Sequence, residues 1–445
     1  MECQQRFVEC EDERRGASSF YYKKKNYHNA RLFLGLLPKN FTVGTRLSRA
    51  TERARGKKKK KRGYPMKRIN NIYESICSYS NCKRAIYNAS YGKRSRKDVK
   101  PVFENIGQYA AILHKILKNQ AYTPTLYRNI VINDRLQGKT RETQVPAFFP
   151  DLCVQHALMQ ILVPILEKRM YYWSCGSRPN KGTNHAKKGI ERATLQRGKK
   201  AKYAVKIDIK KCYPTIGNDA LMRAFERLIK DKRALWLVET IVRSCAGLPI
   251  GNYTSAWFCN FYLTPIDRLI KEAHKINFYV RYIDDMVLVD SNKRKLKKAV
   301  KDVEARLAEM GLSIHPNWNI FRIRQAGRGH KDRPIDFVGY CFCLGYTTQR
   351  KRNALSLMRH SRKIAKRHAA GQAIPPKMAA GFLARAGQLR HFKSQGLKRK
   401  YVDTLPLKLI KGVVRNESKR KSNTVGSVQR TPATRQGGLY VHTVL

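Results

Sequence analysis

The chain is poor in acidic residues for its size. Its 445 residues include 31 Asp and Glu against 92 Lys and Arg, which gives a formal net charge of +61 at pH 7. Self-repulsion at this charge disfavours a compact state, and neutralisation by phosphates relieves the repulsion. Hydrophobic residues still make up 42% and aromatic residues 10%, which excludes wholesale disorder. The composition therefore favours nucleic acid as the partner, well ahead of an anionic membrane.

Long apolar runs and paired cysteines are also lacking. The chain has no run of 18 apolar residues, so we expect no membrane-spanning helix, and residues 1–6 lack the apolar core of a secretory signal. The eleven cysteines are odd in number and include no CxxC pair, which suits reduced thiols in the cytoplasm better than a disulfide framework. For Cys341 and Cys343, ordinary burial is favoured over a zinc site with downstream histidines.

Composition and periodicity divide the chain into segments. Residues 1–65 have scattered charges and six consecutive basic residues at 57–62, which predicts a basic, disordered N-terminal extension; the alternative is a nucleic-acid-binding arm. Residues 66–200 begin with the three-and-four spacing of amphipathic helices, and an alternating pattern over 122–146 predicts a hairpin. This segment is therefore expected to combine helices with a hairpin.

The rest of the chain changes character twice. Residues 201–345 alternate strand and helix signals, which predicts an α+β domain with an antiparallel sheet and helices on one face. The expected strands cover 203–207 and the two halves of 278–288, and the expected helices cover 219–230, 255–273 and 293–310. Residues 346–411 are basic and helical, whereas 412–445 are rich in Ser, Thr, Gly, Arg and Gln and predict a flexible tail.

Because carboxylates are scarce, their positions are informative. Asp284 and Asp285 lie between two apolar runs in residues 279–289, YVRYIDDMVLV, which indicates two buried strands joined by a tight turn. Adjacent like charges at the tip of an apolar hairpin repel each other and are costly to desolvate, and a polyvalent cation removes that cost. A solvent-exposed Asp-Asp turn is the alternative, since the short pattern alone is weak.

A third carboxylate, Asp208, lies 76 residues before Asp284 and ends a β-branched strand. Alone, it could be a helix cap. Together, the three aspartates place hard oxygen ligands at one sheet edge, which favours Mg²⁺ or Mn²⁺ over zinc. Two such ions stabilise the attacking and leaving oxygens of an in-line phosphoryl displacement. Given the positive charge of the chain, the expected substrates are a nucleic-acid strand and a nucleoside triphosphate.

At these residues the sequence resembles the reverse transcriptases. Asp208 with Tyr213 matches the first palm motif, and residues 282–285 (YIDD) match the YxDD motif. Residues 247–263 (GLPIGNYTSAWFCNFYL) stand at the place of the template- and nucleotide-handling loop and helix. Two later palm motifs are resembled by residues 311–316 and 335–340, and the second of these is the primer grip. The fingers motifs of bacterial enzymes are resembled by residues 146–170 and 176–183.

The resemblance covers about residues 66–400 and implies a right-hand polymerase of the α+β class. Its fingers would be residues 66–200, its palm with the primer grip 201–345, and its helical, basic thumb 346–411. Asp208 and Asp284 are implied to bridge two Mg²⁺ ions, for which Mn²⁺ can substitute. Asp285 would be a weaker ligand and the carbonyl of Ile209 an additional one.

The resemblance also implies substrate contacts, for which simpler interpretations exist. Tyr213 would lie under the incoming sugar and select deoxynucleotides, although a core tyrosine fits the same position. Expected triphosphate ligands are Lys139, Arg141 and Arg178, although a cation in so basic a chain is more often solvated. The loop residues Ile250, Gly251 and Asn252 would approach the templating base or nucleotide, the alternative being a plain turn.

Contacts to the growing duplex are implied further downstream. The primer grip would consist of Phe337, Val338 and Gly339. Basic residues of the thumb would hold an A-form RNA/DNA duplex through its phosphates. The alternative is a solvated basic face. These residues are Arg359, Arg362, Lys363, Lys366 and Arg367.

Within the family, the loop form IGNxTSxW at residues 250–257 resembles the reverse transcriptases of diversity-generating retroelements. Group II intron enzymes instead carry Gln-Gly at 250–251 and Ser-Pro at 255–256. The chain departs from the retroelement pattern at Ala256, where Gln is usual, and in lacking a Lys at 317–319. The resemblance implies copying of a template RNA with errors at adenines, and a basic, ring-forming accessory protein.

Other interpretations remain open. Within the same chemistry, the chain could be a retron, phage-defence or group II intron-like reverse transcriptase, bacterial or phage-encoded. In a different class, it could be a non-catalytic RNA-binding protein that retains the fold, although the intact aspartates argue against this.

Overall fold

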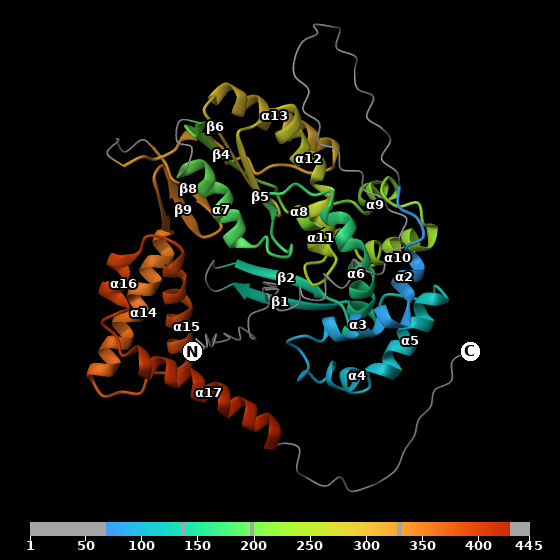
Figure 1. Cartoon of the computed structure of the whole chain (residues 1–445), viewed down its shortest axis with the longest axis horizontal. Helices are drawn as coiled ribbons and strands as arrows, with labels where there is room; N and C mark the ends of the chain where they lie inside the picture. Colours follow the sequence, from blue (N-terminus) through green and yellow to red (C-terminus); the bar gives the residue numbers. More distant parts are fainter. Residues whose placement is uncertain (1–67, 135–138, 196–199, 327–331, 428–445) are drawn as a thin grey trace, which may run out of the picture. The chain divides into compact units, whose positions relative to one another are not determined.

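The computed structural model describes residues 68–134, 139–195, 200–326 and 332–427 (Figure 1). The predicted extension 1–65 and the end of the predicted tail, 428–445, lie outside these ranges. The described residues form two compact units, divided between Ile323 and Arg324. This division falls inside the segment expected to be the palm. No cysteine in the described ranges forms a disulfide.

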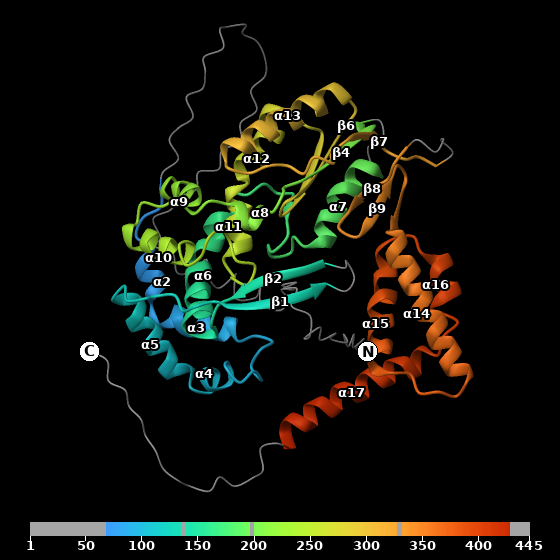
Figure 2. The same cartoon turned by 180° about the vertical axis from the view of Figure 1, so that it is seen from behind.

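The larger unit begins with helices that pack around one another. The helix α3 contacts both α5 and α6, and Figures 1 and 2 show this group together at one end of the unit. Their shared core contains the fully buried Leu113 and Leu117, as the helical spacing of this segment predicts. The helices are α2 (Tyr73–Cys77), α3 (Tyr79–Ala89), α4 (Lys100–Glu104), α5 (Ile106–Lys118) and α6 (Cys153–Glu167).

One helix in the described ranges, residues 148–167, is long and apolar enough to cross a membrane by length and composition alone. It combines η3 (Phe148–Leu152) with α6, and 61% of its apolar window is buried inside the protein. Val154 and Leu158 are fully buried. A core position therefore accounts for its apolar composition.

The predicted hairpin over 122–146 is confirmed. Strands β1 (Arg128–Asp134) and β2 (Lys139–Val145) pair antiparallel, with Arg128 opposite Val145.

The central sheet has the order β3-β5-β6-β4-β7. Only β3 pairs with β5 in parallel; the other pairs are antiparallel, as predicted for the palm. The apolar run after residue 278 forms two strands joined by a turn, also as predicted. The strands are β3 (Ser174–Cys175), β4 (Tyr203–Asp208), β5 (Phe278–Tyr282), β6 (Asp285–Asp290) and β7 (Ile320–Arg322).

Helices cover both faces of this sheet rather than the one face predicted. On one face, α7 (Thr183–Thr194) packs so closely that a Cβ on Gly189 would lie 2.7 Å from Val280 Cγ2. On the other face, the Tyr279 hydroxyl donates to Asp267 Oδ1 of α12 (Thr264–Arg268) at 2.8 Å. Buried residues on both sides of β5 and β6 require this double cover, because an uncovered apolar face would remain in water.

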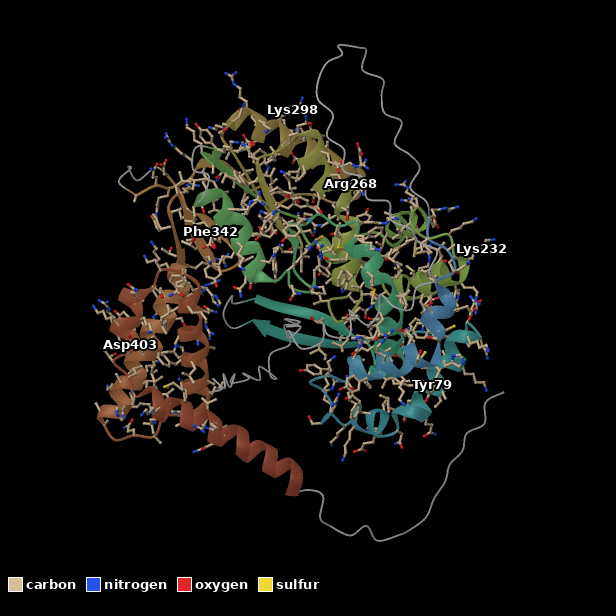
Figure 3. The ribbon with its side chains drawn as sticks, in the orientation of Figure 1. Tyr79, Lys232, Arg268, Lys298, Phe342 and Asp403 are labelled. Atoms are coloured by element: carbon tan, nitrogen blue, oxygen red, sulfur yellow. The ribbon has the colours of Figure 1, made fainter. Side chains whose placement is uncertain are left out.

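The remaining helices of this unit follow the prediction in part. The helix predicted over 219–230 is α9, which ends at Glu226, and the helices α8 and α10 were not predicted. The helix predicted over 255–273 is three consecutive segments with Pro265 at the start of the second, and α13 confirms the helix predicted over 293–310. Figure 3 shows Lys298 on the outer side of α13, one of its many exposed basic residues. The segments are α8 (Cys212–Thr215), α9 (Asn218–Glu226), α10 (Lys232–Val242), α11 (Ser255–Tyr262), η5 (Leu269–Ala273) and α13 (Lys293–Glu309).

The smaller unit has its own sheet and its own core. Its strands have the order β10-β9-β8, and its helices enclose the fully buried Leu357, Ile364, Phe382 and Ile410. The helical character predicted for 346–411 is confirmed from Lys351 onward, whereas residues 346–349 form the strand β10. The elements are β8 (Ile335–Phe337), β9 (Tyr340–Cys343), β10 (Tyr346–Gln349), α14 (Lys351–Ala369), α15 (Pro376–Gln388), η6 (Leu389–His391), α16 (Gln395–Tyr401) and α17 (Leu407–Ser427).

The last helix, α17, corrects the prediction of a flexible tail from residue 412. Its first turns bring Val413 and Val414 against the core of the smaller unit. Two apolar residues among many polar ones are a weak signal in composition, but they suffice to continue a helix that is already anchored by Ile410.

Candidate active site

The central sheet brings the predicted aspartates together. In the register of β4 and β6, Asp208 lies directly opposite Asp285. Strands β5 and β6 are joined by the two residues Ile283 and Asp284, since Tyr282 pairs with Asp285. Directly opposed residues of antiparallel strands have Cβ atoms roughly 5 Å apart and point to the same face. The backbone therefore gathers all three positions at one sheet edge.

The backbone around Asp208 is fixed from a third segment. The Asp208 carbonyl accepts from His315 N at 2.7 Å, and Lys210 N donates to Ser313 O at 2.8 Å. Ile209, whose carbonyl is an expected metal ligand, is buried and forms an isolated bridge with Ile314. Residues 311–316, which resemble a palm motif, thus hold the end of β4 in place.

Asp285 lies in an environment that suits a bound cation. Burial raises the pKa of its carboxyl to about 6, Lys206 opposes this, and the charges of Asp208 and Asp284 add to it. Lys206 Nζ lies 2.9 Å from Asp285 Oδ2. Asp285 Oδ1 is buried and has no hydrogen-bond partner among the described residues. A buried anionic oxygen without a donor fits a metal ligand, because such atoms otherwise find partners.

The side chains themselves are not arranged as a closed three-ligand cluster. Within the described part of the chain, no three His, Cys, Asp or Glu side chains come close enough to hold a metal ion. Two causes keep these side chains from closing into a cluster. The like charges of neighbouring carboxylates repel one another, and Lys206 already holds one oxygen of Asp285. The donor set, all hard oxygen, still matches Mg²⁺ or Mn²⁺.

Tyr213 lies next to this edge. It follows β4 in the short helix α8, after Lys211 with a φ of +45° turns the chain. Burial raises the pKa of the Tyr213 phenol well above its usual value, and nearby groups including Cys259 and Asp284 add to this. Its carbonyl accepts from Leu248 N at 2.9 Å. The position fits both the predicted sugar contact and the core alternative.

The loop before α11 packs against the β1–β2 hairpin. A Cβ on Gly251 would lie 2.2 Å from Gln144 O, so the glycine permits close contact with β2. Asn252 is buried and its amide donates to the Tyr127 hydroxyl at 2.9 Å. Ile250 is 42% exposed. Ile250 is thus the most exposed of the three residues and Gly251 is half-buried, and the approach of this loop to the templating base or nucleotide stays a prediction.

The predicted triphosphate ligands have different positions. Arg178 is buried; its Nε and Nη2 donate to both oxygens of Glu167 at 2.8 Å, and its Nη1 donates to backbone carbonyls of 171 and 174. Since its guanidinium is already paired inside the protein, Arg178 is not presented to a phosphate, contrary to the prediction. Lys139 and Arg141 lie in β2, but their side chains are outside the described part of the structure.

The predicted primer grip is a strained hairpin turn in the smaller unit. Phe337 is fully buried, and the two turn residues between β8 and β9 have positive φ, +43° at Val338 and +90° at Gly339. Positive φ at both central residues is typical of the tight turn that suits the twist of paired strands. Arg350 N donates to Gly339 O at 3.3 Å, and the Arg350 guanidinium pairs with Asp336. The hairpin is thereby joined to the start of α14.

All five predicted duplex contacts lie on α14. Four of them are exposed: Arg359, Arg362, Lys363 and Lys366. Arg367 is half-buried and donates to the carbonyl of Ala373 at 3.0 Å. The helix therefore presents a cationic surface, which fits phosphate binding as well as a solvated basic face.

Sequence reasoning missed Lys206, Arg281 and Asp267. Lys206 lies two residues before Asp208, and period-two alternation puts it on the same face of β4. Arg281 interrupts an apolar strand, and a cation within a buried strand requires a buried partner. Both signals were present in the sequence, but the partner of Arg281 was not identifiable from it.

The geometry of the central sheet agrees with a comparison to known families. The family model described as reverse transcriptase (RNA-dependent DNA polymerase) matches residues 149–342. This part of the chain is a reverse transcriptase domain. It contains the three aspartates, Tyr213 and the β8–β9 turn, and the family that it matches is that of the RNA-dependent DNA polymerases.

Several curated proteins are similar to the chain that carries this reverse transcriptase domain. Protein YkfC of Escherichia coli K12 is 23% identical over 56% of this chain and 73% of its own length. The retron Ec73 reverse transcriptase of Escherichia coli is 33% identical over 31% of this chain and 48% of its own length. A putative COX1/OXI3 intron 1 protein of Saccharomyces cerevisiae is 29% identical over 33% of this chain and 17% of its own.

Among solved structures, similarity is found to telomerase. Apo telomerase of Candida tropicalis, truncated from its C-terminal domain, matches with a TM-score of 0.37 and 18% identity, over 53% of this chain and 58% of that chain. A telomerase of the same species with a fragment of telomeric RNA matches with a TM-score of 0.39 and 14% identity, over 73% of this chain and 59% of that chain. The chain thus spans less than two thirds of either telomerase.

The raised pKa of Asp285 predicts a pH dependence of cation binding. Because its folded pKa of about 6 lies above the ordinary value of 3.8, the folded state binds more protons between these values. Asp285 therefore favours folding at acidic pH, and this contribution declines as pH rises through 6. A cation competes with that proton, so we expect Mn²⁺ binding, followed by electron paramagnetic resonance, to weaken as pH falls below about 6.

The variant Lys206→Met tests whether Asp285 causes this loss of Mn²⁺ binding at acidic pH. Without the Lys206 charge, which lowers the pKa, the loss of Mn²⁺ binding should begin at a higher pH. The matched control is Lys298→Met, a change at an exposed residue of α13, and it should lose Mn²⁺ binding at the same pH as the parent chain. If Lys206→Met also lost Mn²⁺ binding at the parent pH, the assignment of the titration to Asp285 would be contradicted.

Proposed function

We propose that the chain copies an RNA template into cDNA. In this reaction a primer 3′-hydroxyl attacks the α-phosphate of a deoxynucleoside triphosphate and displaces pyrophosphate. The observation that carries the proposal is the placement of Asp208 opposite Asp285, beside the turn with Asp284, within a reverse transcriptase domain. The partners would be a template RNA, the RNA/DNA duplex and deoxynucleoside triphosphates.

The geometry and the family resemblance support the following roles for the residues. Asp208 and Asp284 would hold the divalent ions, with Asp285 and the Ile209 carbonyl as further ligands. Two Mg²⁺ or Mn²⁺ ions supply electrostatic stabilisation of the attacking and leaving oxygens. The exposed cations of α14 would bind duplex phosphates, and the β8–β9 turn would position the primer.

The direct experiment is primer extension by the purified full chain. An RNA template annealed to a DNA primer, with deoxynucleoside triphosphates and Mg²⁺, should give full-length cDNA, and chelation of the metal should stop it. If the chain binds the annealed template but does not extend the primer under these conditions, it is instead an RNA-binding protein that retains the fold.

Tyr213 is proposed to exclude ribonucleotides. Its half-buried ring beside Asp284 would meet a 2′-hydroxyl of the incoming sugar, so truncation should relieve the clash. We expect Tyr213→Ala to lower the preference for deoxynucleotides, measured as the ratio of kcat/KM values, by roughly tenfold or more. Tyr213→Phe keeps the ring and should keep the preference. If the alanine variant keeps it too, Tyr213 is a core residue.

We further infer that the chain serves a diversity-generating retroelement. The supporting feature is the IGNYTSAW loop at residues 250–257, together with the basic segment 347–353. A retron enzyme is the second candidate, favoured by the 33% identity to the retron Ec73 enzyme. Sequencing of the cDNA separates the two. Errors concentrated at template adenines, a near-duplicate repeat in the flanking DNA and a basic accessory protein would support the retroelement, whereas errors without adenine bias would count against it.

A further inference from the structure

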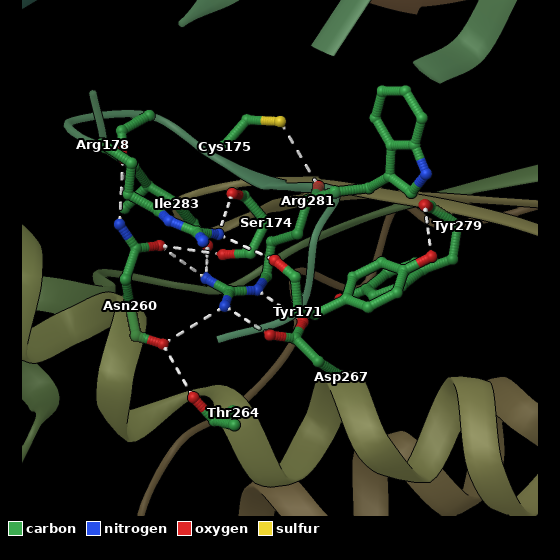
Figure 4. Close-up of polar contacts among 12 residues, drawn as sticks. Tyr171, Ser174, Cys175, Arg178, Asn260, Thr264, Asp267, Tyr279, Arg281 and Ile283 are labelled. Atoms are coloured by element: carbon green, nitrogen blue, oxygen red, sulfur yellow. Dashed lines mark hydrogen bonds and ion pairs between the residues drawn. The ribbon is translucent and has the colours of Figure 1, made fainter. Parts of the chain in front are cut away.

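We propose that the buried ion pair of Arg281 and Asp267 positions the turn that carries the catalytic aspartates. Neither residue belongs to the expected ligand set, and Arg281 lies on the face of β5 opposite to that of Asp285, because its partner in the register is Met286. Figure 4 shows the guanidinium of Arg281 at the centre of a network of polar contacts beneath this turn. The role is one of positioning, and it rests on the proposed polymerase function.

The turn needs a constraint because its backbone is strained. Ile283 has a φ of +57°, a region that β-branched residues rarely occupy and that costs of order 1–3 kcal/mol. The neighbouring segment is close: a Cβ on Gly176 would lie 2.7 Å from Ile283 Cγ1. Such a conformation persists only when the surrounding contacts hold it, and Asp284 is the next residue along the chain.

Both backbone polar groups of Ile283 are held. Its amide donates to the Cys175 carbonyl at 3.0 Å, and its carbonyl accepts from Arg281 Nη1 at 2.9 Å. The first contact comes from the end of β3 and the second from a side chain two residues before the turn. The Arg281 contact therefore fixes the orientation of the peptide that leads into Asp284.

The guanidinium that makes this contact is itself immobilised. Arg281 and Asp267 are almost completely buried, and Arg281 Nε and Nη2 donate to the two oxygens of Asp267 at 2.8 and 2.6 Å. The carboxyl of Asp267 also accepts from Tyr279, and Asn260 accepts twice from Arg281. Only the planar fork of arginine satisfies all these acceptors, so lysine would keep the charge but lose the geometry.

A buried pair could simply stabilise the fold, and the same hairpin offers a control for that alternative. Asp290, at the far end of β6, is also buried, pairs with Lys295 and accepts from the amides of Asn277 and Asn292. It makes no contact with the turn in the described structure. Removing its charge should affect stability in the same way as removing that of Asp267, without affecting the turn.

The experiment compares Arg281→Lys and Asp267→Asn with Asp290→Asn in the full chain. Each variant is measured for Mn²⁺ binding by electron paramagnetic resonance, for thermal unfolding, and for kcat and KM in primer extension. We expect the first two to weaken Mn²⁺ binding and to lower kcat by roughly 100-fold with little change in KM, because misplacement by about 1 Å has such effects. Asp290→Asn should lower thermal stability only.

A rescue variant separates positioning from stability. Glycine adopts positive φ at no steric cost, so Ile283→Gly should reduce the need for the Arg281 contact. We expect the loss of kcat caused by Arg281→Lys to be smaller in the Ile283→Gly background than in the parent chain. Independent, multiplicative losses would overturn the proposal, as would an Arg281→Lys variant that loses stability but keeps its Mn²⁺ affinity.

Failure of the proposed function would be recognised separately. If the parent chain does not extend a primer, the polymerase assignment fails, whereas the difference in Mn²⁺ affinity between the Arg281→Lys and Asp290→Asn variants still decides whether Arg281 positions the turn.

Discussion

The Asp284→Asn variant is expected to lose RNA-templated primer extension almost completely. An amide cannot supply the anionic oxygen that holds a divalent ion, and the opposing residues Asp208 and Asp285 cannot replace it from their own strands. Removal of a single electrostatic contact to a transition state costs roughly 10²–10³-fold in kcat, and we expect at least this loss. RNA binding, which we propose to depend on basic residues elsewhere, should be retained.

The measurement pairs single-turnover extension with a filter-binding assay for the RNA. The control is Asp219→Asn, since Asp219 is an exposed carboxylate on α9 that pairs with Arg243 on the surface. It should leave both properties unchanged. Persistent extension by Asp284→Asn would show that the reaction takes place elsewhere or that Asp284 is not a metal ligand.

The Phe382→Ala variant is expected to unfold the smaller unit. Phe382 is fully buried among the helices of that unit, in a core separate from that of the larger unit. Truncation of a buried phenylalanine costs about 3–5 kcal/mol, which is a large part of the stability of an ordinary domain. Because each unit has its own core, the larger unit should keep its folded signal, and duplex binding through α14 should be lost.

Limited proteolysis with mass spectrometry would detect the unfolding of the smaller unit, because cleavage should then concentrate after residue 350. Leu409→Ala, on the exposed side of α17 at 48% exposure, removes a similar side chain without leaving a cavity and should resemble the parent chain. Equal protease resistance of the Phe382→Ala chain would mean that the smaller unit does not depend on this core.

The sequence predicts the central sheet well, for physical reasons. The apolar runs of β4, β5 and β6 are strong, and the paired charges of Asp284 and Asp285 require a turn between two buried strands. The position of Asp208 at the end of its strand then follows from the same pattern. These features depend on neighbours in the sequence or on a period of two, which a linear sequence displays directly.

Features that depend on distant partners were not predictable. Arg178 has the residue type of a phosphate ligand, but its pairing with Glu167 is visible only in three dimensions. Gly251 was interpreted as a place where a nucleotide approaches, whereas its close neighbour is the backbone of β2, over a hundred residues earlier. The cover of the second face by α7 was missed, although the continuous apolar runs of β5 and β6 are typical of strands that are buried on both faces.

The position of the boundary between the two units has a practical consequence for dissecting the enzyme. A fragment ending at residue 345 would discard β10 and leave β9 with an unpaired edge, which invites self-association. Cutting between Ile323 and Arg324 instead keeps the three-stranded sheet with the Arg350–Asp336 contact intact. Separately expressed halves should therefore be designed with the turn at Val338 and Gly339 on the same polypeptide as the basic helices.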